Sequence, residues 1–378
     1  MTARASGVRE LAAILGAAAG GRIDVARTRD GAGWQRVVDA AGARQLLPST
    51  WSAVRALDLL VPVPEALLDA LGDPEHERNH PAAVLQRAHR ANGARNADLL
   101  AQLDDAAALA GVPVVAIKGI GAVARGVYDD PADRVMRDLD LLVARDEASA
   151  VHDRLRQAGY EIVDDLDPHD RHHLRTLRRR DRFGSIEVHV APVARGWRDA
   201  VTVDEVLREA RPVGGDGRVL VPCATHAAVI ALVHAYLADG AWHARDVPLR
   251  TIHELWLLDR REPVDWPTAR RLLQRVGRGH LVDEHLVLAH ALLGAPERTR
   301  AWRPRLRHML GEHGLERAFA PVERVAAAFD TGRLRRHYGP GAGGPWRLRA
   351  THLLNQARRR RAPAPGRPPH PPSAPATR

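Results

Sequence analysis

The chain has 378 residues, 45% of them hydrophobic and 27% charged, a composition typical of a globular protein with a substantial core and two or three packed units. Its single cysteine rules out an internal disulfide framework and a cysteine-based zinc cage and fits a reducing compartment, so we expect a cytoplasmic protein. The formal net charge of +10 suggests a nucleic-acid partner, but six arginines and no acidic residue lie in the last 24 residues, and without these arginines the charge is about +4, so the basicity belongs mainly to the tail.

The N-terminal region, residues 1–110, is predicted to be mostly helical. Apolar residues recur at helical spacing over 34–46, 49–60 and 82–111. Gly111 ends the longest of these segments, and glycine is typical of helix ends because it adopts a left-handed backbone without strain. A different pattern begins directly after it.

Residues 111–200 are predicted to form a small mixed β-sheet core. Short β-branched runs alternate with helical segments, in the order strand, helix, strand, helix and then further strands. The expected elements are 112–117, 120–127, 138–143, 146–158, 160–163, 172–179 and 185–190. This order is typical of a compact sheet domain with helices packed on it.

From residue 201 to about 338 helical signals return, most clearly over 225–237 and 248–259. The longest apolar stretch of the chain, 227–237, is too short to cross a bilayer, so we expect no membrane partner. Residues 339–378 are rich in proline and arginine and are predicted to be a disordered tail. The expected fold is therefore α+β, a small mixed β-sheet core between an N-terminal and a C-terminal helical region.

One lysine stands among arginines. Of the 56 basic residues, only Lys118 is not arginine. A lysine kept against such a bias suggests a position that needs a compact ammonium rather than a planar guanidinium. Chance retention is the alternative, and a single residue does not exclude it. Lys118 directly follows a predicted strand, which favours the functional interpretation.

Asp138 and Asp140 begin the second predicted strand. Side chains alternate along a strand, so these two carboxylates project from the same face and repel each other unless a cation lies between them. Mg²⁺ is the expected cation, because Mg²⁺ binds through one or two carboxylates together with substrate phosphates. Mn²⁺ is the alternative. By itself an Asp-x-Asp pair is a weak signal, and two exposed strand acids are the simpler interpretation.

Basic and glycine residues near the pair strengthen the prediction. Lys118 and Gly119 end the first strand and open a helix, where glycine allows close backbone approach and free amides favour phosphate oxygens. Arg134 and Arg137 lie in the loop before the acids, where cations would neutralise a triphosphate. For Lys118 and Arg134 a buried salt bridge that shapes the loop is the other interpretation, and both remain open at this stage.

A third carboxylate lies on a later strand. Glu187 and His189 are two residues apart in the run 185–190 and therefore share one face. Glu187 is a candidate third metal ligand or base, and His189 is a candidate proton carrier.

The stretch 114–143 resembles the polymerase-β-like nucleotidyltransferases, and most closely their uncharacterised nucleotidyltransferase family. The resemblance rests on Ile117-Lys118-Gly119, Tyr128, the run Arg134-Val135-Met136-Arg137-Asp138-Leu139-Asp140-Leu141-Leu142-Val143, and a downstream Glu187-x-His189. Weaker matches extend it over about 30–300, at Asn96, His226 to His234, Leu249-Arg250 and Glu254. There are two departures: no serine follows the strand as it does in the wider superfamily, and Glu254 stands where the family commonly has aspartate.

The resemblance implies transfer of a nucleoside monophosphate from an NTP to an unidentified acceptor, a small molecule or a protein, with release of pyrophosphate. It implies metal binding by Asp138, Asp140 and Glu187. It implies nucleotide binding by Lys118, Gly119, Arg134 and Arg137. Two alternatives stay open: a catalytically inactive binding or regulatory module with this fold, and an RNA-directed nucleotidyltransferase that uses the basic tail.

The remaining histidines and the cysteine carry no predicted site. His172 and His173 are adjacent on a predicted strand, so their side chains should point in opposite directions, and we interpret them as solvated or core residues. Cys223 has no evident histidine or aspartate partner in the sequence and is predicted to be structural. His226 is interpreted as an interdomain packing residue.

Overall fold

The computed structural model describes residues 3–25, 30–64, 80–163, 172–241 and 246–298. The N-terminal helices are α1 (Ala3–Ala18), α2 (Gly31–Ala43), α3 (Leu47–Ala56) and α6 (Pro81–Ala110). Asp30 caps α2 by accepting a hydrogen bond from the Gly33 amide at 2.7 Å, and Pro81 opens α6 where no amide donor is needed. Gly111, with φ of +67°, ends α6 as predicted.

In the described part of the chain, seven strands form one mixed sheet in the order β3-β4-β5-β2-β1-β7-β6. The strands are β1 (Val114–Ala116), β2 (Asp138–Leu142), β3 (Glu161–Ile162), β4 (Leu177–Arg178), β5 (Ser185–His189), β6 (Arg211–Val213) and β7 (Val219–Val221). The central pairs are β1 with β2, antiparallel, β2 with β5, parallel, and β1 with β7, parallel. The predicted α+β class with a mixed sheet is confirmed.

Helices follow and connect these strands. They are α7 (Lys118–Ala124), the 3₁₀ turn η1 (Pro131–Asp133), α8 (Ala148–Gln157), the 3₁₀ turn η2 (Arg195–Trp197), α9 (Val203–Glu209), α10 (Ala224–Leu232), the π-helical turn η3 (Val233–Ala238), α12 (Leu249–Arg261), α13 (Trp266–Gln274) and α14 (His280–Leu293). Among the described residues, none of the helices has both the length and the apolar character needed to span a bilayer.

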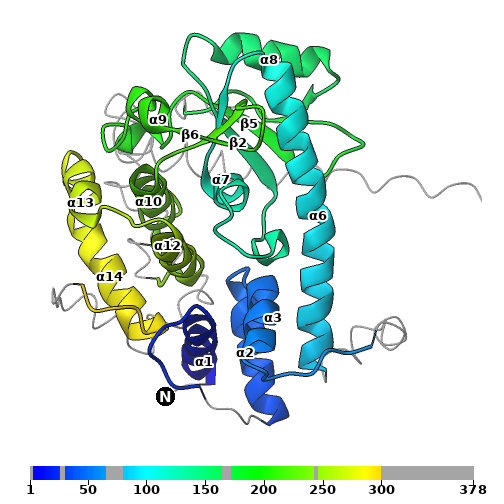
Figure 1. Ribbon diagram of the computed structural model, residues 1–378, viewed down its shortest axis with the longest axis vertical. Coiled ribbons are helices and arrows are strands. Elements are labelled where there is room, and N and C mark those ends of the chain that lie inside the picture. The colour runs from blue at the N-terminus through cyan, green and yellow to red at the C-terminus, as the bar shows by residue number, and fades with distance from the viewer. Residues whose placement is uncertain (1–2, 26–29, 65–79, 164–171, 242–245, 299–378) are drawn as a thin grey trace, which may run out of the picture.

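Figure 1 shows how the two helical regions meet the sheet. The long helix α6 runs from the N-terminal helices up to α8 beside the sheet, and α10, α12, α13 and α14 form a group on the other side. Helix α1 packs against α2 and α3 as well as against α14, so the N-terminal and C-terminal helices are in contact. The sheet is thus supported from both sides by helices that are far apart in sequence.

One part of the secondary-structure prediction is wrong. Residues after 200 were expected to be helical, but β6 and β7 form an antiparallel hairpin that joins the sheet through β1. Strands of three residues carry too little periodicity to be recognised in sequence, and Pro212 lies in β6 at the edge of the sheet, where a missing amide donor is tolerated. The predicted tail, 339–378, lies outside the described residues.

Candidate active site

The two aspartates of β2 and the glutamate of β5 lie on one face of the sheet. In the parallel pair β2–β5, Asp140 is directly opposite Glu187, and Asp138 is opposite Ser185. Since strand side chains alternate, Asp138 and Asp140 share a face, and the register adds Glu187 to that face. Leu139 between them is fully buried. The structure therefore places on one face the three carboxylates that the sequence singled out, although the group of ligand atoms within 4.8 Å of one another is Asp140, Glu187 and His189, without Asp138.

Asp140 is held by two cationic or ionisable partners. The Lys118 ammonium donates to Asp140 Oδ1 at 2.6 Å, and His189 Nε2 lies 2.8 Å from the same oxygen. His189 Nε2 also lies 3.5 Å from Glu187 Oε2. Atoms of Asp140, Glu187 and His189 suitable as metal ligands all lie within 4.8 Å of one another. His189, predicted as a proton carrier, thus bridges two of the predicted metal ligands.

Asp138, Asp140 and Glu187, called the acidic cluster from here on, shift one another's pKa values. Burial, together with the negative charges of Asp140 and Glu187, raises the pKa of Asp138 to about 6. Burial acts in the same direction on Asp140, but the Lys118 and His189 charges outweigh it and hold the pKa of Asp140 well below its usual range. The proton is therefore retained most easily at Asp138, the acid without a directly bonded cation.

Lys118 occupies an unusual backbone position. Its φ is +56°, in the left-handed region that side chains other than glycine rarely adopt, and such a conformation costs on the order of 1 kcal/mol. Its side chain is only 16% exposed. Burial alone would lower the pKa of Lys118, but the charges of Asp140 and Glu187 raise it, so the ammonium stays charged. The only lysine of the chain is thus held in place by the acidic cluster.

Arg134 forms a separate buried ion pair. Its Nε donates to Glu254 on α12, its Nη1 donates to the Val135 carbonyl at 2.6 Å, and the Tyr128 hydroxyl donates to the same Glu254 carboxylate at 3.1 Å. Burial would lower the pKa of Arg134, but the Glu254 charge raises it above its ordinary value. The salt-bridge interpretation of Arg134 describes what the structure contains, and its role in nucleotide binding stays a prediction.

Two asparagines of α6 fix the backbone of the same loop. Asn92 Nδ2 donates to the carbonyls of Ala132 and Arg134, at 2.7 and 2.9 Å. Asn96 Nδ2 donates to the carbonyls of Pro131 and Arg134, at 2.6 and 2.7 Å. Because both amides converge on the Arg134 carbonyl, α6 sets the path by which the chain enters β2.

The other two predicted nucleotide-binding residues differ in their surroundings. Gly119 is buried, and a Cβ built there would lie 3.2 Å from Met136 Cγ and 3.3 Å from Arg134 Nη2, so glycine allows Arg134 to pass closely. Arg137 is exposed, directly precedes β2 and makes no ion pair with any residue that the structure describes. Its role in nucleotide binding stays a prediction.

The amino-acid sequence matches one known protein family. The profile of a family described as uncharacterised nucleotidyltransferase matches residues 30–294. The chain belongs to this nucleotidyltransferase family. A search of curated proteins and a search of solved structures each gave no match. The family match begins at Asp30, the cap of α2, and ends at Gly294, the cap of α14, so it covers the sheet and both flanking helical regions and leaves out α1.

The sequence-based prediction of how His172 and His173 are oriented is wrong. His172 and His173 were expected to point in opposite directions, but their ring centroids are 4.7 Å apart, and each lies 5.3 Å from the His189 ring. The segment forms only an isolated bridge, His173 with His189, so strand alternation does not apply to it. His173 Nε2 also lies 3.9 Å from Glu187 Oε2. Only the fold brings His173 to Glu187.

Proposed function

We propose that this protein is a Mg²⁺-dependent nucleotidyltransferase that transfers a nucleoside monophosphate from an NTP to a small-molecule or protein acceptor and releases pyrophosphate. Membership of a nucleotidyltransferase family supports the reaction class. The single observation that carries the proposal is the placement of Asp138, Asp140 and Glu187 on one face of two paired strands, beside Lys118. Three carboxylates on one face repel one another, and a bound cation would relieve that repulsion.

The donor set fits a hard divalent cation. Mg²⁺ and Mn²⁺ both take oxygen ligands, and Asp138, Asp140 and Glu187 supply only oxygens. Burial and the two neighbouring carboxylates raise the pKa of Asp138 to about 6, which indicates an excess of negative charge that a cation would relieve. These three residues would hold the ion, and bound Mg²⁺ would neutralise triphosphate charge and favour the ionised acceptor hydroxyl.

The reaction is an in-line displacement. The acceptor oxygen forms a bond to the α-phosphorus, the bond from that phosphorus to the bridging oxygen of the β-phosphate breaks, and pyrophosphate leaves with the electron pair. The hydroxyl proton passes to solvent or to a carboxylate of the cluster. Lys118 lies where its ammonium would stabilise phosphate charge, and exposed Arg137 would contact the outer phosphates. Arg134, held by Glu254, would position the loop that carries Arg137.

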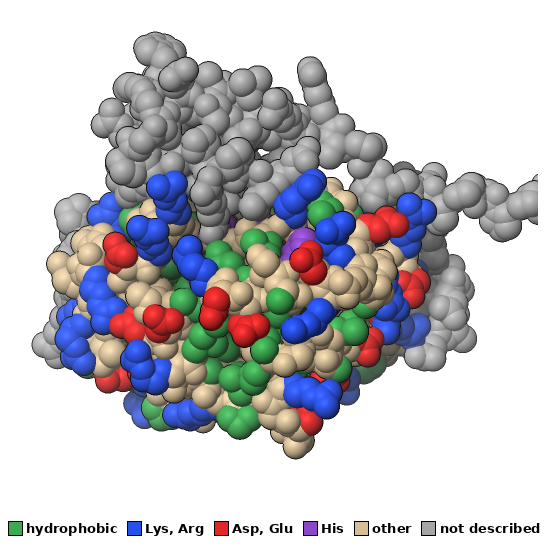
Figure 2. All heavy atoms as spheres, turned by 90° about the horizontal axis from the view of Figure 1, so that it is seen from above, with side chains coloured by type: hydrophobic (Ala, Val, Ile, Leu, Met, Phe, Trp, Pro, Cys, Tyr) green, Lys and Arg blue, Asp and Glu red, His purple; other side chains and the backbone are tan. Residues whose placement is uncertain are grey.

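Figure 2 bears on the acceptor. On the face that it shows, the basic side chains of the described residues are interspersed with acidic ones. A polyanion such as RNA binds best along a continuous basic track. A small or protein-attached hydroxyl is the acceptor class that we propose for this site.

Nucleotide binding by calorimetry tests the proposal. ATP, GTP, CTP and UTP are titrated into the protein with and without Mg²⁺, and at least one is expected to bind in a Mg²⁺-dependent manner. The double variant Asp138→Asn/Asp140→Asn should lose this binding, whereas Asp153→Asn, a matched change of an exposed acid on α8, should keep it. Mg²⁺-independent binding, or binding that ignores the double variant, contradicts the proposal.

Transfer itself is measured by the mass of candidate acceptors after incubation with the bound NTP. The expected product is heavier by one nucleoside monophosphate, and the double variant should form it on the order of a hundredfold more slowly or worse, since the metal contributes several kcal/mol of transition-state stabilisation. Binding without transfer to any hydroxyl acceptor would instead identify an inactive binding module.

A further inference from the structure

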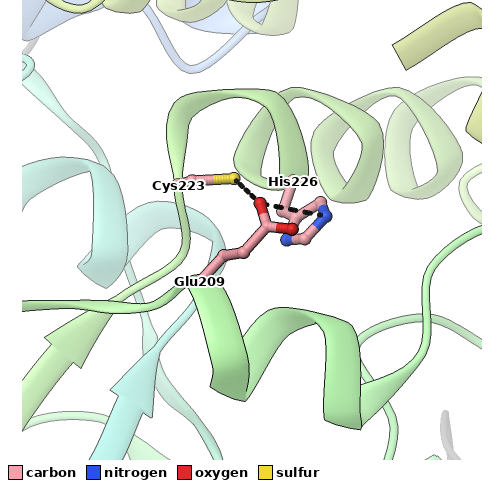
Figure 3. A group of neighbouring side chains, drawn as sticks. All are labelled: Glu209, Cys223 and His226. Atoms are coloured by element: carbon pink, nitrogen blue, oxygen red, sulfur yellow. Dashed lines mark hydrogen bonds and ion pairs between the residues drawn. The ribbon is translucent and has the colours of Figure 1, made fainter. Parts of the chain in front are cut away.

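A second group of ionisable side chains lies away from the acidic cluster, where α9 and α10 meet (Figure 3). Glu209 is the last residue of α9, Cys223 precedes α10, and His226 lies in the first turn of α10. The Cys223 thiol donates to Glu209 Oε2 at 3.3 Å, and His226 Nε2 lies 3.8 Å from the same oxygen. Ligand atoms of all three residues lie within 4.8 Å of one another.

The spacing of these atoms is close to that of a tetrahedral metal site. Zinc bonds of ~2.0–2.3 Å at tetrahedral angles place neighbouring ligand atoms ~3.4–3.6 Å apart. The two separations known here, 3.3 Å from sulfur to oxygen and 3.8 Å from nitrogen to oxygen, differ from these values by a few tenths of an ångström. Small side-chain rotations would therefore complete the geometry without backbone movement.

The imidazole of His226 supplies an independent observation. His226 is 4% exposed, and among the described residues neither its buried Nδ1 nor its Nε2 has a hydrogen-bond partner. A buried polar group without hydrogen bonds is destabilising, and a bound metal ion would satisfy it. Burial also lowers the pKa of His226, which favours the neutral imidazole that binds metals. Figure 3 shows the His226 ring beside the Glu209 carboxylate, with the Cys223 thiol on the same carboxylate oxygen.

We propose that Glu209, Cys223 and His226 bind one zinc-type divalent cation. A thiolate, an imidazole and a carboxylate form a mixed set that suits Zn²⁺ and not Mg²⁺, in contrast to the all-oxygen set of the acidic cluster. The composition excludes a cage of several cysteines but not such a mixed set. The Glu209 side chain is 53% exposed, so the fourth ligand position opens to solvent and takes water.

Ion binding replaces a proton at the thiol. Burial and the Glu209 carboxylate raise the pKa of Cys223, while the amides of Thr225 and His226 lower it. On binding, the sulfur forms a bond to the metal and its proton is released to solvent. The nearby Arg125 and Arg275 are engaged by other acids: Arg125 pairs with Glu262 at 2.9 Å, and Arg275 pairs with Glu205 at 2.7 Å.

The bound ion would have a structural role, because it would link two helices. It joins the end of α9 to the start of α10, and the hairpin β6–β7 lies between these two points in the chain. Strand β7 pairs in parallel with β1, and Lys118 follows β1 after one residue. A bound ion would therefore stabilise the side of the sheet from which the only lysine approaches the acids.

Cobalt absorption tests the site directly. Full-length protein is treated with a chelator, desalted and titrated with Co²⁺, because a Co²⁺–thiolate bond gives a charge-transfer band that oxygen and nitrogen ligands do not. The chain has one cysteine, so this band reports on Cys223 alone. A saturable band that Zn²⁺ displaces is expected in the wild type and in Asp138→Asn/Asp140→Asn, and its absence from the wild type overturns the proposal.

Variants assign the ligands. Cys223→Ser should abolish the band, and His226→Gln and Glu209→Gln should each weaken Co²⁺ affinity by about tenfold or more, since even outer-shell partners contribute ten- to a hundredfold. His290→Gln on α14 is the matched control and should leave the affinity unchanged. Equal affinity in wild type and His226→Gln contradicts the assignment.

A measurement on the wild type alone avoids misfolded variants. Zn²⁺ should slow alkylation of Cys223, followed by intact mass, by at least about tenfold. Mg²⁺ at the same concentration should have no effect. Alkylation at the same rate with and without Zn²⁺ overturns the proposal. Because Mg²⁺-dependent NTP binding is measured separately, the zinc site and the proposed transferase site stand or fall independently.

Discussion

Two buried cations approach the sheet from neighbouring loops, and their surroundings differ. Lys118 shares Asp140 with His189 and faces two further carboxylates, Asp138 and Glu187. Arg134 forms its ion pair with Glu254, whose carboxylate also accepts a hydrogen bond from Tyr128. Around Lys118 carboxylates outnumber the lysine, whereas Arg134 and Glu254 are paired one to one. The arrangement around Lys118 suits a site that binds ligands. The Arg134–Glu254 pair suits a structural salt bridge, called the brace below.

Breaking the brace should have the largest effect on stability. Arg134→Leu leaves Glu254 buried without its cation, and the loss of one partner of a buried pair costs about 3–5 kcal/mol of unfolding free energy. Urea denaturation measures this. Arg137→Leu, three residues along the same loop but exposed, should change the stability by less than about 0.5 kcal/mol. Equal losses in the two variants would mean that Arg134 is not a brace.

Removal of the lysine should cost less. In Lys118→Met, Asp140 keeps His189 as a partner and the left-handed backbone strain is unchanged, so we expect a loss of about 1–3 kcal/mol. The variant should also gain more thermal stability from added Mg²⁺ than the wild type does, because a competing cation has been removed from the carboxylates. A Mg²⁺-induced shift in Tm that is the same in both proteins contradicts this view of the cluster.

Two buried histidines, His253 and His285, differ from both cations, because no neighbouring negative charge keeps them ionised. Burial lowers the pKa of His253 to about 4 and that of His285 to about 3. Above pH 6.5 both are neutral in the folded and the unfolded chain and have no effect on stability. Below pH 6.5 the unfolded chain binds protons that the folded chain refuses, so stability falls as the pH drops toward 4.

The slope for each histidine should approach ~1.4 kcal/mol per pH unit. Denaturation of the wild type and His285→Leu at several pH values measures it, and the variant should show a shallower decline because one of the two histidines is absent. Parallel curves for the two proteins would show that His285 is not kept neutral. His290→Leu, in which the changed residue is exposed on the same helix, is the control.

The sequence predicted the acidic face well, because its logic is local. Strand alternation places Asp138 with Asp140 and Glu187 with His189 whatever the surrounding fold is. The parallel register that sets Asp140 opposite Glu187 is a property of the sheet, and neither strand alone contains it. Local patterns therefore indicated which residues meet, and the tertiary structure supplied how they are arranged.

Other contacts could not be predicted because their partners are distant in sequence. Glu254 lies 120 residues beyond Arg134, and although the family resemblance pointed to both, nothing in the sequence showed that they pair. Cys223 was interpreted as a residue without partners because Glu209 reaches it only after the β6–β7 hairpin has folded back. The β6–β7 hairpin was not predicted, and for that reason the contact between Glu209 and Cys223 was not predicted either.

The rarity of lysine gives this protein a built-in label. Apart from the chain's N-terminal amine, Lys118 carries its only primary amine, and that amine lies 2.6 Å from a carboxylate oxygen of the acidic cluster. Reductive methylation with ¹³C-formaldehyde would place an NMR-visible methyl group at this one side chain. Its chemical shift would then follow the arrival of a metal ion or a nucleotide in intact protein, with no residue replaced.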